Sequence, residues 1–265
     1  MAAGCGGGTK GPAVIGSSGG GGAAWAPTLE VAPADVPGVI VYAAFAAPDD
    51  AGMMPAAPAG TAVWPIEGEA VDTLASPYHV LGGSGELVTA QAGAPTVIEH
   101  GCDGGNLNVL PLTPTGGATL PPGPAWAIRG DVPTGWDLAA APIAAGTTSK
   151  TTRTWQAGPL TLTSATTTAT AGALTITAGD QVIGSVPYER GTMDDDPSAV
   201  IDLTERWTPG IPTPVGVWLL APTGPAVVAL ASNGFEGAGV STYLVDDDSV
   251  ELIEQLGTGI YYCAY

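Results

Sequence analysis

Histidine, cysteine and aspartate side chains gather in one short stretch of the chain. His100, Cys102 and Asp103 form an H-x-C-D cluster, and His79 precedes it. Histidine and cysteine are ordinary zinc ligands, so one hypothesis is a metal-dependent hydrolase that uses His79, His100 and Asp103. The chain contains neither a C-x-x-C nor an H-E-x-x-H pattern. The alternative interpretation is a disulfide cysteine in a glycine-rich loop.

Two runs of three aspartates lie between expected strands, at Asp194-Asp195-Asp196 and at Asp246-Asp247-Asp248. Calcium binds hard oxygen ligands on flexible turns, so Asp194, Asp195 and Asp196 are candidate metal ligands and calcium is the candidate cofactor. Three adjacent aspartates point in different directions and lack the D-x-D-x-D-G alternation that converges on one ion. The alternative is a solvated turn that keeps sheet edges from pairing.

No serine stands in a nucleophile motif. Gly82-Gly83-Ser84-Gly85 is one glycine out of frame with G-x-S-x-G, and it predicts a hairpin turn instead. A Ser-His-Asp triad would need His79 or His100, because the chain has only these two histidines. We leave enzymatic activity open and favour its absence.

The first residues of the chain include Ala3, Gly4 and Cys5, with Ala2 before them. This pattern resembles the cleavage box of bacterial lipoproteins, in which two small residues precede a cysteine that becomes acylated. The glycine-rich residues after Cys5 are typical of a flexible tether. The resemblance implies lipidation of Cys5, an apolar signal segment encoded upstream, and export to the bacterial outer membrane, periplasm or cell surface. The alternative is a disordered N-terminus with an incidental cysteine.

If Cys5 is acylated, Cys102 and Cys263 remain as a pair. Two remaining cysteines commonly form a disulfide in an oxidising compartment. Spacing in the sequence does not give the distance between the two Cα atoms, so two buried free thiols are the alternative.

The charge balance is strongly acidic. The chain has 25 Asp and Glu against 6 Lys and Arg, a net charge of −19. This charge excludes binding to nucleic acid by phosphate neutralisation and opposes contact with anionic lipid. We therefore expect a membrane contact only through a lipid on Cys5, and we expect a protein or carbohydrate partner.

Short apolar and β-branched runs, bounded by Gly, Pro, Asn or Asp, recur along the chain, and no amphipathic helix of three turns is evident. We predict an all-β fold with a tether over residues 1–27 and two β-sandwich-like domains, 28–145 and 146–265. The boundary is placed in the Ala-, Pro-, Gly- and Thr-rich stretch 141–149. A single continuous β domain and a propeller-like fragment are the alternatives.

Two stretches give more detailed predictions. Residues 161–177 alternate Thr with Leu, Ala or Ile, which predicts a hairpin with a solvent-facing threonine side and a turn near Ala171-Gly172.

The runs 226–231 and 240–245, with Asn233-Gly234-Phe235-Glu236-Gly237 between them, resemble a degenerate FG-GAP (integrin-type) repeat. The acidic calcium loop of that family has no counterpart at residues 221–225. The resemblance therefore implies only a strand-loop-strand unit.

These features together favour an exported surface or periplasmic lipoprotein that serves as a binding or structural module. The metal-dependent hydrolase is one alternative. A virion or filament surface subunit, which would also be acidic, β-rich and rich in Gly and Thr, is the other.

Overall fold

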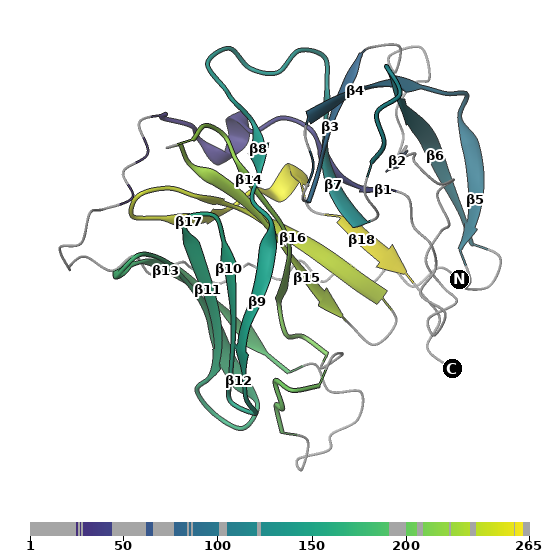
Figure 1. The fold of residues 1–265 in the computed structure, drawn as a ribbon. Coiled ribbons are helices and arrows are strands. Elements are labelled where there is room, and N and C mark those ends of the chain that lie inside the picture. The colour runs from purple at the N-terminus through teal and green to yellow at the C-terminus, as the bar shows by residue number, and fades with distance from the viewer. Residues whose placement is uncertain are drawn as a thin grey trace.

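The computed structural model confirms the all-β, sandwich-like fold. It describes residues 25, 27, 29–43, 62–65, 77–83, 85, 87–100, 105–120, 123–190, 200–205, 209–222, 224–233, 237–256 and 258–261. Regular structure in these residues is β-strand, apart from the short 3₁₀ turns η1 (Pro33–Asp35) and η3 (Glu254–Leu256). Three antiparallel sheets result, which we call A, B and C (Figure 1). Within the described part of the chain, no helix has the length and apolarity needed to cross a bilayer.

Sheet A is formed by the first seven strands. They are β1 (Val39–Ala43), β2 (Ala62–Pro65), β3 (Tyr78–Gly82), β4 (Leu87–Ala92), β5 (Thr96–His100), β6 (Gly105–Pro114) and β7 (Gly123–Arg129). Their order is β2-β1-β7-β3-β4-β6-β5, and β2 also pairs with β6. The extra pairing closes the sheet on itself. Alternate side chains then fill its interior, among them Val41, Tyr78, Val80 and Leu112.

The strands β4 and β5 pair with successive parts of β6. Ala92 pairs with Leu112, and Thr96 pairs with Val109, so one extra residue lies on the β4–β5 side. Gly93 between them still donates its N–H to Pro111 O at 2.8 Å. An extra residue of this kind is a β-bulge, which bends the strand and increases its twist.

Sheet C is a five-stranded meander. Its strands are β9 (Ile143–Thr148), β10 (Thr152–Ala157), β11 (Leu160–Thr166), β12 (Ala171–Ala178) and β13 (Gln181–Glu189). The predicted threonine hairpin is confirmed as β11 and β12, with Leu162, Leu174 and Ile176 fully buried on the inner side. Its turn lies at residues 167–170, and Ala171-Gly172 already belongs to β12.

Sheet B is formed by β8 (Ala139–Ala140), β14 (Thr213–Leu219), β15 (Ala226–Asn233), β16 (Gly237–Val245) and β17 (Val250–Leu252), and β18 (Thr258–Tyr261) also pairs with β16. The predicted strand-loop-strand unit near residues 226–245 is the β15–β16 hairpin.

Sheet B lies between the other two sheets, and both of its faces are buried (Figure 1). On β15, Val227 and Ala229 belong to the core shared with sheet A, whereas Val228 and Leu230 belong to the core shared with sheet C. Successive strand residues point to opposite faces, so a strand buried on both sides needs an unbroken apolar run.

The N-terminal and C-terminal halves share the core between sheets A and B. Trp218 of β14 donates its indole N–H to Gly82 O at 3.1 Å. Its ring centroid lies 6.2 Å from that of Trp126 in β7. The chain passes from β8 in sheet B to β9 in sheet C near the predicted boundary 141–149. The division into domains 28–145 and 146–265 stays a prediction.

The N-terminal segment contacts the folded body from Trp25 onward, two residues before the predicted tether ends at residue 27. Trp25 packs against the core between sheets B and C, and Leu29 and Val31 pack against the core between sheets A and B. Residues 1–24 of the predicted tether lie outside the described residues.

Candidate functional site

Most of the site residues predicted from the sequence lie outside the described part of the chain. These are Cys5, Cys102, Cys263, Asp103, Asp194, Asp195 and Asp196. The lipid anchor, the disulfide and the calcium site at Asp194–Asp196 therefore stay predictions.

The two histidines lie far apart along the strands. His79 in β3 pairs with Thr89, and its Nδ1 lies 2.9 Å from Gly130 O. His100 ends β5 opposite Gly105, the first residue of β6, whereas Thr115, just past the last residue of β6, donates its N–H to Thr89 O. The ten residues of β6 span up to about 33 Å. The described backbone thus gives no support to a site that joins His79 to His100, and the hydrolase stays a prediction.

The second aspartate run forms a tight turn after β16. Asp246 N–H donates to Ser249 O at 3.0 Å, and Asp247 N–H donates to Asp246 Oδ1 at 2.8 Å. Burial raises the pKa of Asp246, and the nearby charges of Asp247, Asp248 and Glu251 add to the rise. Among the described residues, no three His, Cys, Asp or Glu side chains are grouped so that they could hold a metal. This turn is therefore not supported as a metal centre.

The outer side of sheet C carries a row of hydroxyl side chains that crosses all five strands. Thr154, Thr163, Thr175 and Ser185 pair in turn across β10, β11, β12 and β13. Thr147 of β9 extends the row, because its Oγ1 lies 3.1 Å from Thr154 Oγ1 and its N–H donates to the same oxygen. These side chains are partly or fully exposed.

The rows on either side of this one carry no charge. One contains Gln156, Thr161, Thr177 and Val182, and the other contains Thr152, Ala165, Ala173 and Pro187. We call these three rows together the hydroxyl face. Its polar groups are already oriented, since Thr161 Oγ1 donates to Gln156 Oε1 at 2.7 Å. Arg153 on β10 points to the other side, where its guanidinium lies 5.1 Å from the Trp155 ring centroid.

The hydroxyl face rests on a packed inner side. Ser164 and Tyr188 share a buried hydrogen bond of 2.6 Å directly behind it. Burial raises the pKa of Tyr188, although its hydrogen bond with Ser164 opposes the rise. Gly172 leaves room for the Tyr188 ring, because a Cβ there would meet the ring at 2.5 Å. The sheet is therefore held from within, and its outer side chains stay partly or fully exposed.

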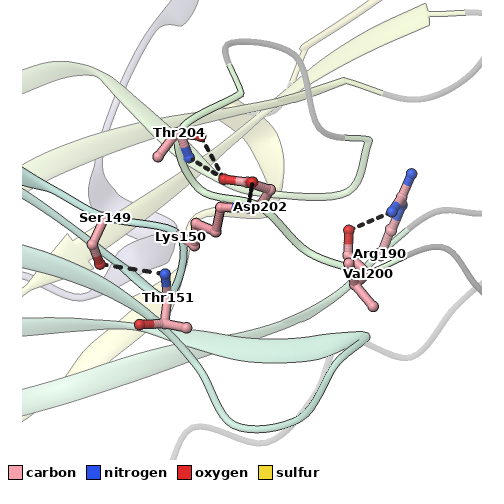
Figure 2. A network of polar contacts seen from close by, with 7 residues as sticks. All are labelled: Ser149, Lys150, Thr151, Arg190, Val200, Asp202 and Thr204. Carbon is pink, nitrogen blue, oxygen red and sulfur yellow. Dashed lines mark hydrogen bonds and ion pairs between the residues drawn. The ribbon is translucent and has the colours of Figure 1, made fainter.

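A polar network fixes one end of sheet C (Figure 2). Asp202, in the crossover after β13, accepts hydrogen bonds from the N–H and Oγ1 of Thr204, and Lys150 Nζ lies 3.5 Å from its Oδ2. The Thr204 hydrogen bonds, with a smaller effect of Lys150, hold the pKa of Asp202 below its usual value. Ile201 N–H also donates to Ala169 O at 2.7 Å, which ties the crossover to the β11–β12 turn.

The sequence predicted the solvent-facing threonines of β11 and β12, but it did not predict the five-strand hydroxyl row as a site. The alternation in residues 161–177 was the available signal. It does not show that Thr147, Thr154 and Ser185 align with this hairpin, because that alignment depends on the register of three further strands.

Comparison with known proteins gives no relative: no family model, no curated protein and no solved structure matches the chain. The resemblances at Cys5 and at residues 226–245 therefore stay predictions.

Proposed function

We propose that this protein is an exported surface or periplasmic binding module that holds a neutral carbohydrate polymer against the hydroxyl face and is anchored through a lipid on Cys5. The observation that carries the proposal is the five-strand hydroxyl row with uncharged rows on both sides. It stands out in a chain of net charge −19.

The chemistry of this face suits a neutral sugar polymer. Threonine and serine hydroxyls both donate and accept hydrogen bonds, as sugar hydroxyls do. Each such bond contributes about 0.5–1.5 kcal/mol net, so several along a row are needed for useful affinity. The strands already fix the side chains, which reduces the entropy lost on binding. The three rows contain no charged group, so sugar binding does not carry the cost of desolvating a charge.

Co-sedimentation with insoluble cellulose and chitin tests the binding function. The double variant Thr163→Val, Thr175→Val removes two neighbouring hydroxyls and keeps the β-branched shape. We expect it to weaken binding by about tenfold or more, from roughly 1 kcal/mol per lost hydrogen bond. Thr89→Val, at an exposed threonine of β4, is the matched control and should bind as the parent does. Absence of binding by the parent, or equal binding by the double variant, contradicts the proposal.

The lipid anchor needs a separate test, because it depends on Cys5 alone. The chain is expressed in a bacterium from its natural reading frame, and the N-terminal peptide is analysed by mass spectrometry. We expect a diacylglyceryl group on Cys5 and release of the Cys5→Ser variant from the membrane fraction. An unmodified Cys5 in the membrane fraction contradicts the anchor but leaves the binding function standing.

A virion or filament surface subunit is the second candidate function. One observation favours it: the exposed and uncharged edge strand β9 would join subunits head to tail if it pairs with a different edge of the neighbouring subunit. Electron microscopy of the concentrated protein tests it, because a subunit of this kind assembles into regular particles or fibres and a binding module does not.

A further inference from the structure

The open edges of the sheets differ in how they are protected from pairing with another chain. Sheet A closes on itself through β2 and β6, and its remaining edge strand β5, which pairs only with β6 among the described strands, contains Glu99. In sheet B, the edge strand β8 has two residues, and the other edge is divided between β17, with three residues and Glu251 exposed, and β18, with four. Short edge strands and edge charges are devices that prevent edge-to-edge association.

The two edges of sheet C form a direct contrast. The edge strand β13 contains Pro187 and ends on Glu189, and its Gln181 side chain donates to Asp247 O at 2.8 Å. Proline removes a backbone donor, and a terminal charge disfavours pairing with another acidic chain. This edge is therefore protected by its own sequence and by the turn of sheet B beside it.

The other edge, β9, lacks the charge and the proline, and its one irregularity is a register shift opposite Thr154 in its pairing with β10. Its six residues, Ile143–Thr148, contain no charge and no proline, and all but Ile143 are exposed. The small side chains of Ala144, Ala145 and Gly146 leave the backbone accessible. The strand hydrogen-bonds to β10 on one side, and no other described strand pairs with it. It presents a row of backbone donors and acceptors of the kind that recruits another strand.

We propose that β9 pairs antiparallel with β9 of a second copy of this chain, around a two-fold axis. The two five-stranded sheets would then form one sheet of ten strands, with the two hydroxyl faces side by side. This inference does not depend on the proposed carbohydrate function.

Charge argues for a second copy as the occupant. Two chains of net charge −19 repel each other in most orientations. Residues 139–149 contain no charged side chain, so the β9 edge lets two copies meet without placing carboxylates opposite one another. An antiparallel pair of identical strands is self-complementary, so the assembly closes as a dimer. A six-residue pairing buries less than the roughly 1,000 Å² of a tight interface, so the dimer is weak.

Sedimentation velocity over a concentration series, at 0.1 M and 0.5 M NaCl, tests the dimer. We expect a reversible monomer–dimer equilibrium that becomes tighter at the higher salt, because salt screens the repulsion between the two acidic bodies. An interface built on ion pairs would weaken instead. A monomer at every concentration and salt, or growth beyond the dimer, overturns the proposal.

Two lysine variants locate the interface. Ala144→Lys places like charges near each other across the two-fold pair and should raise the dimer Kd by about tenfold or more. Val182→Lys is the matched control, at an exposed residue of the opposite edge strand β13. Both variants make each copy less negative, so a general charge effect would strengthen association in both. Equal weakening by the two, or no weakening by Ala144→Lys, overturns the β9 interface, and thermal unfolding of each variant checks that the fold is kept.

Discussion

Sheets B and C are both antiparallel and contain consecutive hairpins, but they differ in what covers their faces. On β15 of sheet B, Val227 and Val228 are both fully buried, each against a different neighbouring sheet. On β12 of sheet C, Leu174 is fully buried whereas Thr175 is partly exposed. This contrast indicates that sheet B holds the molecule together and that sheet C has one face available for contacts.

The largest effect is expected in the core on the sheet A side of sheet B. Trp218→Ala removes a fully buried ring and its hydrogen bond to Gly82 O. We expect a loss of about 3–5 kcal/mol in the free energy of unfolding, measured by urea denaturation, because the site is packed between two sheets and cannot collapse easily. A loss below about 1 kcal/mol would contradict the central role of sheet B.

The inner side of sheet C should tolerate change less well than its outer side. In Gly172→Ala, the new Cβ would meet Ala165 O and the Tyr188 ring, each at 2.5 Å. We expect a loss of about 1–3 kcal/mol from this overpacking. Gly93→Ala is the control, since its Cβ meets nothing closer than 3.6 Å and the change should be near neutral. Equal effects of the two substitutions would show that the inner side is loosely packed.

Tyr188→Phe tests the buried hydrogen bond behind the hydroxyl face. Ser164 is fully buried, so losing its partner should lower the free energy of unfolding by about 1–2 kcal/mol at pH 7. No measurable loss at that pH would mean that the bond contributes nothing.

Tyr188→Phe should also change how the free energy of unfolding depends on pH. Burial raises the pKa of Tyr188 above its usual value near 10, so above this pH the unfolded state releases a proton that the folded state retains. Stability should therefore fall as the pH rises above about 10, and Tyr188→Phe should show a shallower fall. Burial also raises the pKa of Tyr243, so part of the fall should remain in the variant. Identical pH profiles would contradict the raised pKa of Tyr188.

The smallest effect on stability is expected on the hydroxyl face itself. Thr163→Val should change the free energy of unfolding by less than about 0.5 kcal/mol, because the side chain is partly exposed and the β-branched shape is kept. Urea denaturation beside Trp218→Ala measures the contrast between the two sheets directly. A cost similar to that of Trp218→Ala would mean that the outer face also holds the fold.

The parts of the fold that follow local patterns could be predicted from the sequence. The alternation in residues 161–177 predicted the β11–β12 hairpin, and the apolar runs near residues 226–245 predicted the β15–β16 hairpin. Both are formed by neighbouring segments with short connections, so the period of the side chains is enough to find them.

Long-range pairing and register could not be predicted in the same way. The closure of sheet A pairs Ala62 with Leu112. Neither segment contains a pattern that identifies the other as its partner strand. The alignment of Thr154 with Thr163 and Thr175 depends on turn lengths, and that of Thr147 depends also on a bulge in the β9–β10 pair. The hydroxyl face is a property of this register, so composition and motifs did not reveal it.

A titration of the isotopically labelled protein with soluble cello- and chito-oligosaccharides, followed by amide NMR, tests whether the hydroxyl face binds carbohydrate. We predict that the shifted signals cluster on the hydroxyl face, at Thr154, Thr163, Thr175 and Ser185, and that the strands of sheet B stay unchanged. Shifts that avoid these residues, or no shifts at millimolar sugar, would contradict the assignment of the hydroxyl face as the binding surface.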